Sequence, residues 1–287
     1  MWFFLSLLCA YLTATTDALS KKALEEENIY YIAWIRLVFC FPFLAIILLL
    51  NEIPAVDRYY FIAVFCGLPL EIIALLCYMK AIQISDLSLT IPFLALTPVF
   101  LIPTSYLMLG EKTGLKGMIG IAFITIGGYI LNIQREKNGF LTPFKMMAKE
   151  KGILLMIAVA FIYSITSNFG KMGITHSSPV FFGCTYFMIQ PFLLLPFIKK
   201  SDMKISSLLK RKKWLLLLIG VVYALSLITH FAALSLTNVA YMIAVKRSNL
   251  IFSVLYGYFF FNEKGIGQRI SGALLMLAGI IILAFQK

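Results

Sequence analysis

Residues 109–131, LGEKTGLKGMIGIAFITIGGYIL, decide the fold, because the chain repeats them at residues 261–283 as FNEKGIGQRISGALLMLAGIIIL. The two copies lie 152 residues apart, so that Glu111 falls on Glu263. The same register continues upstream through the apolar segments that precede each copy. A chain that carries one unit twice is expected to fold as two equivalent halves.

Long apolar segments surround both copies. Hydrophobic residues make up 61% of the 287 residues and charged residues only 13%, whereas a soluble domain is nearer half apolar and a quarter charged. The apolar residues form blocks of about 20, the length that a helix needs to cross about 30 Å of hydrocarbon. We therefore predict an all-α membrane protein with ten transmembrane helices, approximately at 2–20, 29–50, 59–81, 87–109, 114–133, 152–171, 179–198, 214–236, 239–261 and 266–285.

The ten predicted spans divide into two halves. We expect a first five-helix repeat at 1–133, a linker at 134–151 and a second five-helix repeat at 152–287. Because five is odd, the second half must enter the membrane in the opposite orientation. Inverted repeats of this kind are typical of alternating-access transporters, which bind their solute between the repeats near the bilayer midplane.

The basic charge of the chain indicates a membrane surface and not nucleic acid. The net charge is +12, and most of the lysines and arginines lie in connectors on one predicted side. This bias predicts that both termini face away from the cytoplasm, in a multi-pass protein of the plasma (inner) membrane. The five cysteines all lie within apolar blocks without a CxxC pair, so we expect no metal and no cofactor.

The two five-helix halves, the Gly-Glu of LGEK (109–112), the Asn-Glu of FNEK (261–264) and the glycines that follow them resemble the EamA-type members of the drug/metabolite transporter superfamily. The resemblance covers essentially the whole chain. It implies a transporter fold but does not specify the substrate, because members of the superfamily carry amino acids, sugars, nucleotide sugars, organic phosphates or drugs.

Two adjacent cations, Lys246 and Arg247, lie inside the ninth predicted span, VAYMIAVKRSNLIFSVLYGYFFF (239–261). They lie about 10 Å from its start, where a charge is costly unless it faces a wet cavity and meets a partner. The pair resembles the Lys-Arg pair that holds the substrate phosphate in the triose-phosphate branch. That branch adds a lysine from span four, where this chain has Leu94. The alternative is a structural link, such as one from Arg247 to Glu71.

The remaining candidates are polar groups within predicted spans. Asn249 shares a helix face with Lys246, and Tyr78 falls on His230 at the repeat offset. The resemblance favours a shared role for Arg36, whose place in the second span carries an arginine in many EamA-type sequences. We predict substrate contact for Lys246, Arg247, Arg36, Asn249, Tyr78, Tyr223 and His230, and a coupling role for the carboxylates Glu71 and Asp17. Structural pairing and core packing stay open as alternatives for each of them.

Three prolines, Pro92, Pro98 and Pro103, interrupt the fourth predicted span. Each removes a backbone donor and loosens the helix. They are either hinges or kinks that the neighbouring helices tolerate.

These features predict a secondary transporter that moves a small polar, anionic organic metabolite by alternating access. An amino-acid or drug exporter of the same fold is the alternative. A membrane-embedded enzyme acting on lipid is disfavoured, because DxxxD, HExxH and GxSxG are missing from the sequence. The expected partners are a small-molecule substrate and the lipid bilayer, for a monomer or homodimer, with no nucleic acid.

Overall fold

The structure, a computed structural model, describes residues 1–287 except 24–28, 85–90, 134–149, 199–204, 262–265 and 286–287. Its described residues form helices and connecting turns. The first half holds α1 (Trp2–Ala23), α2 (Ile29–Leu49), α3 (Arg58–Ile84), η1 (Ile91–Leu96), α5 (Thr97–Leu109) and α6 (Leu115–Ile133). The second half holds α8 (Lys151–Thr175), α9 (Pro179–Ile198), α10 (Ile205–Ser235), α11 (Val239–Lys246), α12 (Asn249–Phe261) and α13 (Ile266–Ala284).

The helices follow the predicted apolar blocks closely, with two differences. Helix α10 begins at Ile205, so the basic run 210–213 lies within a helix and not in a connector as the sequence predicted. The fourth and ninth predicted spans are each divided into two helical pieces. The predicted linker, 134–151, lies outside the described residues except for its last two.

Within the described residues, five helices are long and apolar enough to cross a membrane: Trp2–Ser20, Arg58–Ala81, Lys151–Thr175, Pro179–Phe197 and Lys213–Ser235. Shorter apolar helical segments cover Ala33–Leu49, Phe93–Leu109, Leu115–Ile130 and Ile270–Ala284. The described residues are therefore all-helical and rich in spans, whereas the number of ten crossings stays a prediction.

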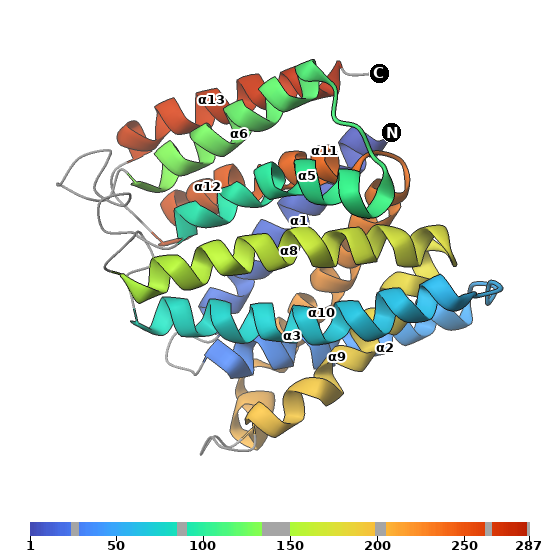
Figure 1. The fold of residues 1–287 in the computed structure, drawn as a ribbon. Coiled ribbons are helices and arrows are strands. Elements are labelled where there is room, and N and C mark those ends of the chain that lie inside the picture. The colour runs from blue at the N-terminus through green and yellow to red at the C-terminus, as the bar shows by residue number, and fades with distance from the viewer. Residues whose placement is uncertain (24–28, 85–90, 134–149, 199–204, 262–265, 286–287) are drawn as a thin grey trace.

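Equivalent helices of the two halves pack in equivalent ways. Helix α3 lies along α8 as α10 lies along α1, and α5 packs on α8 as α12 packs on α1. The pairs α6–α13 and α2–α9 each join matching helices of the two halves (Figure 1). In these matching pairs, helices of one half pack against helices of the other half.

The α6–α13 pair depends on glycines at its contact. A Cβ atom at Gly127 would lie 2.6 Å from the backbone nitrogen of Met276, and one at Gly279 would lie 2.6 Å from the carbonyl oxygen of Gly120. Atoms cannot approach so closely without a shift of backbone. Small residues therefore set the distance between these two helices, as they do at many contacts in membranes.

The breaks in the divided spans occupy the same place in both halves. Helices α5 and α12 have 13 residues each and begin at Thr97 and Asn249, which are equivalent in the repeat. In the first half, Pro98 in the first turn of α5 follows the 3₁₀ helix η1. In the second half, the backbone tightens through i→i−3 hydrogen bonds such as Ser248 N to Val245 O, 3.0 Å. The sequence predicted an uninterrupted ninth helix, and nothing like a proline marks its break.

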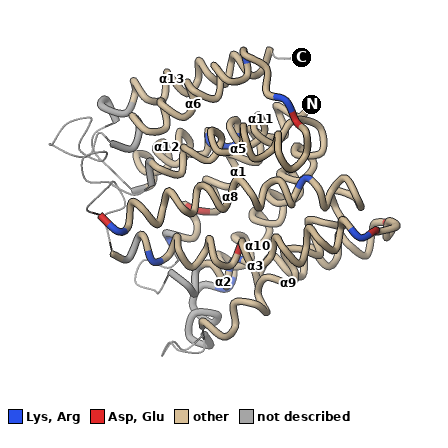
Figure 2. Tube along the Cα trace, in the orientation of Figure 1, with Lys and Arg blue, Asp and Glu red and all other residues tan. Residues whose placement is uncertain are grey.

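The chain termini lie at one end of the bundle (Figure 1). Most described charges lie near the two ends of the bundle, and a few lie near its middle (Figure 2). These few central charges include the candidates for a solute site.

Candidate functional site

Lys246 is the last residue of α11 and faces the neighbouring helix α10. Its Nζ lies 3.3 Å from Nδ1 of His230. An ammonium group has only hydrogens to offer, so Nδ1 of His230 accepts and its Nε2 carries the ring hydrogen. A neutral imidazole therefore orients the lysine without cancelling its charge.

Arg247 occupies the break between α11 and α12. Its Nη2 donates a hydrogen bond of 2.9 Å to Oγ1 of Thr97, at the matching break of the first half. The buried Nε atom of Arg247 has no hydrogen-bond partner among the described residues, and neither have Oγ of Ser248 and Oδ1 of Asn249. Buried polar atoms normally have partners, so these three atoms lack hydrogen bonds that a bound molecule or a water could supply.

Neither cation lies within ion-pair distance of a carboxylate among the described residues, although Glu71 interacts electrostatically with Lys246. The ion pairs found there are Arg36–Asp17 and His176–Asp57. The alternative link from Arg247 to Glu71 is therefore not formed.

Arg36 lies in a second charged cluster, between α1, α2 and α10. Its Nη1 is 2.8 Å from Oδ1 of Asp17, and its guanidinium lies 4.7 Å from the ring centre of Tyr223. The side chain of Asp17 is 47% exposed and that of Arg36 is 20% exposed. Asp17 thus balances Arg36, and the pair is open on one side.

The remaining candidates lie on α3, between the two clusters. The carboxyl group of Glu71 interacts with the hydroxyl of Thr166 on α8 and with the charge of Lys246. The phenol of Tyr78 is within electrostatic reach of Asp17, Arg36 and Arg247. The structure therefore brings the predicted residues of both halves into one region.

Two residues of this region were not among those predicted from the sequence. Tyr163 on α8 interacts electrostatically with Glu71, Tyr78 and Arg247, but a tyrosine in an apolar helix carries no distinguishing signal. Thr97 could have been found, because the repeat places it opposite Asn249.

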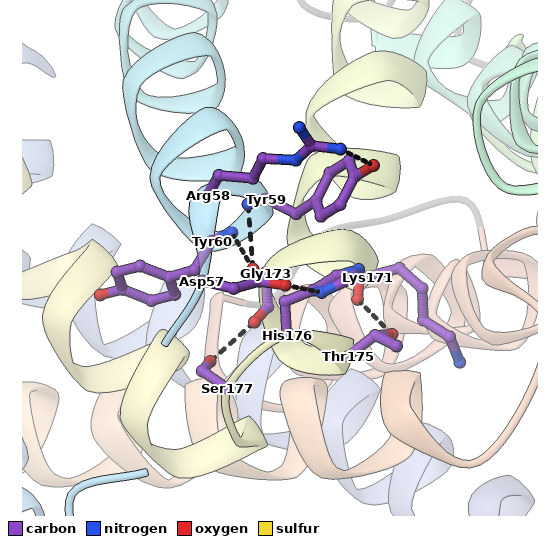
Figure 3. A network of polar contacts seen from close by, with 9 residues as sticks. All are labelled: Asp57, Arg58, Tyr59, Tyr60, Lys171, Gly173, Thr175, His176 and Ser177. Atoms are coloured by element: carbon purple, nitrogen blue, oxygen red, sulfur yellow. Dashed lines mark hydrogen bonds and ion pairs between the residues drawn. The ribbon is translucent and has the colours of Figure 1, made fainter. Parts of the chain in front are cut away.

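Several charged residues at the end of the bundle that holds the termini have clear partners. Asp57 precedes α3, and its Oδ2 lies 2.8 Å from Nδ1 of His176 at the end of α8 (Figure 3). Its Oδ1 accepts hydrogen bonds from the backbone N–H groups of Tyr59, 2.9 Å, and Tyr60, 3.3 Å. Burial alone would raise the pKa of Asp57, but the hydrogen bonds from His176, Tyr60 and Tyr59 lower it below its usual value.

The same end joins the fourth and ninth spans through Glu111. Its Oε2 accepts a 2.8 Å hydrogen bond from the backbone N–H of Val239, the first residue of α11. An anion is favourable at a helix N-terminus. Burial raises the pKa of Glu111, and the bond from Val239 opposes this shift.

Lys171 on α8 completes this end. Its Nζ donates to the carbonyl oxygens of Leu234 and Thr237, beyond which α11 begins. Lysine at a helix C-terminus is favourable because it satisfies free carbonyl groups. We call Asp57, Glu111, Lys171 and His176 the terminal network, because each is matched by an opposite charge or a helix end.

Comparison with known proteins agrees with this architecture. A sequence profile described as "EamA-like transporter family" matches residues 1–133 and 150–285. A solved structure described only as "Crystal structure of protein" is 12% identical, with a TM-score of 0.76, over 98% of this chain and 94% of that chain. No curated protein matches the chain significantly.

Proposed function

The chain belongs to the EamA-like transporter family, and on that premise we propose that it moves a small, polar, anionic organic metabolite by alternating access. It is an integral multi-pass membrane protein of the drug/metabolite transporter type. The proposal adds ten crossings, both termini outside the cytoplasm, and a place in the plasma (inner) membrane as a monomer or homodimer.

The proposal that the substrate is an anion rests on one observation. Lys246 and Arg247 lie side by side in the chain with neutral partners, His230 and Thr97. A buried charge without a counter-charge is costly, and the cost falls when an anion binds. Neutral partners hold the two side chains in place and leave their charges available to a solute.

The chemistry of the donors favours an oxyanion such as a phosphate or carboxylate. Lys246 acts as a point charge, and Arg247 offers a planar fork that matches either group. The Nε2–H of His230 supplies a further donor, and Asn249, Tyr78, Tyr223 and Arg36 complete the proposed site. The Lys-Arg pair supports a likeness to the triose-phosphate branch.

Glu71 and Asp17 are the proposed coupling groups. Asp17 already balances Arg36, so a proton that reaches Asp17 would release Arg36 toward the substrate. Glu71 lies near enough to Lys246 to interact with it electrostatically. Carboxylates inside a membrane commonly relay protons, and exchange of one anion for another is the alternative.

The matching breaks in the fourth and ninth spans give the proposed rocking motion its hinges. Short 3₁₀ segments within a helix often mark such points. Arg247 joins the two breaks through Thr97, so movement at the hinges and capture of the solute involve the same side chains.

Thermal stability of the purified protein tests the substrate class, because a ligand that binds only the folded state raises the melting temperature. The panel contains sugar phosphates, carboxylates, nucleotides, amino acids, neutral amines and aromatic cations. We expect stabilisation by organic anions, followed by their counterflow in proteoliposomes.

The other outcomes separate the alternatives. Stabilisation by amino acids alone, or by aromatic cations alone, would favour the amino-acid or drug exporter. Chemical turnover of a lipid without vesicles would identify an enzyme.

A further inference from the structure

Thr97 makes a contact that the sequence does not reveal. Its Oγ1 accepts from Nη2 of Arg247 at 2.9 Å and donates to the carbonyl oxygen of Leu94 at 2.8 Å. Thr97 is only 1% exposed, at the first residue of α5. Because the hydroxyl uses its hydrogen toward Leu94, the oxygen that faces Arg247 is held as an acceptor.

A neutral acceptor can fix the position of an arginine side chain without cancelling its charge. The side chain of arginine carries about 2 kcal/mol of rotamer entropy, so a free guanidinium would sample many positions. A carboxylate would fix it but also cancel its charge. Thr97 fixes it with the charge intact, and Nε of Arg247 remains buried without a partner among the described residues.

The internal repeat supports a division of labour between the two halves. Thr97 is equivalent to Asn249, whose Oδ1 also lacks a partner in the described part of the chain, and Arg247 is equivalent to Ala95. The second half therefore supplies the cation, and the first half supplies the acceptor that aims it.

We propose that Thr97 is the positioning residue for Arg247: its hydroxyl holds the guanidinium of the second half so that the remaining N–H groups face the anionic substrate. This role rests on the proposed function, because it assumes that Arg247 binds the substrate. It differs from a purely structural link between α5 and α11, which would change stability but not anion affinity.

The test compares Thr97→Val, which keeps the shape but loses the acceptor, with Thr97→Ser, which keeps the hydroxyl. Thr125→Val is the matched control, because Thr125 is buried in α6 and its Oγ1 has no partner among the described residues. Binding of inorganic phosphate, glycerol 3-phosphate and citrate to the purified protein is measured by the shift in melting temperature with concentration.

We expect Thr97→Val to weaken binding of the best of these anions about tenfold, the usual effect of losing a hydrogen bond to a charged group. Thr97→Ser should restore most of the affinity, and Thr125→Val should leave it unchanged. In an Arg247→Lys background, Thr97→Val should add little, because residues that act as one unit are not additive.

These variants distinguish a failure of the positioning role from a failure of the proposed function. If Arg247→Ala loses anion binding but Thr97→Val binds as tightly as the unaltered protein, the positioning role is overturned and the proposed function stands. If Thr97→Val weakens binding equally in the Arg247→Lys background, Thr97 acts independently of Arg247 and the proposal is also overturned. If the unaltered protein binds none of the three anions, both the proposed function and this role are rejected.

Discussion

The charged residues of the terminal network and those in the middle of the bundle differ in the partners that they meet. In the terminal network, Asp57 meets His176, and Glu111 meets the start of α11. In the middle, Lys246 and Arg247 form hydrogen bonds only to neutral partners among the described residues, and Glu71 acts on Lys246 electrostatically without an ion pair. A matched charge holds helices together, whereas an unmatched charge costs stability and is kept for what it binds.

The Asp17–Arg36 pair stands between these two cases. It is matched, like the terminal network, but it lies beside Tyr223 and within reach of Tyr78, in the region of the unmatched cations. A charge pair of this kind can serve as a structural tie or as a switch that opens when the acid is protonated.

The largest effect is expected for Lys246→Met, which removes an unmatched charge but keeps the length of the side chain. Transport of the best organic anion, measured by counterflow in proteoliposomes, should fall at least about 100-fold. The melting temperature should stay level or rise, because a half-buried charge without an ion-pair partner is lost. Transport at the normal rate would remove Lys246 from the site.

A smaller effect is expected for Asp17→Asn, which leaves Arg36 without its counter-charge. If Asp17 is the coupling acid, uptake should persist at a reduced rate and lose its response to an imposed pH gradient. Initial rates with and without the gradient measure this. A rate that still follows the gradient as in the unaltered protein would assign coupling elsewhere, with Glu71→Gln as the next variant.

In the terminal network, Glu111→Ala should affect stability and spare transport. It removes the acceptor for the N–H of Val239, at a cost of about 1 kcal/mol in the free energy of unfolding. Glu111→Gln keeps an oxygen at that place and should recover most of the loss. Denaturation in detergent measures stability, and counterflow per folded molecule should be unchanged. Loss of counterflow in the Gln variant would show that the terminal charges also take part in transport.

The smallest effect is expected for Asp57→Asn, at an exposed pair. Because the folded pKa of Asp57 is lowered, its contribution is present above the unfolded value of about 3.9 and is lost as pH falls through the folded value. The difference in melting temperature between Asp57→Asn and the unaltered protein should therefore exist at neutral pH and vanish on acidification. A difference that grows in acid would contradict this sign.

Most of the helix boundaries could be predicted from the sequence, because the length of an apolar block is set by the thickness of the bilayer. The break in the fourth span was foreshadowed by Pro98, which cannot donate within a helix. The break before Asn249 was not, because the sequence around it holds neither proline nor glycine.

The charges of the candidate site stand out in the sequence, but the contacts that they make in the structure do not. Lys246 and Arg247 stand out because cations are rare inside an apolar span. Their partners, His230 and Thr97, depend on how α10 and α5 are rotated against α11, and periodicity within one helix does not determine that. The repeat offset alone could have directed attention to Thr97, as the counterpart of Asn249.

The central claim is that the unmatched cations are the anion site, and a binding titration tests it most directly. Purified protein is titrated with the organic anion that stabilises it best, and compared with the double variant Lys246→Met/Arg247→Ala. The double variant Lys112→Met/Lys116→Met has the same net charge and alters exposed lysines at the terminal end. We predict saturable binding that the first variant loses and the second keeps; equal affinity in all three proteins would contradict the claim.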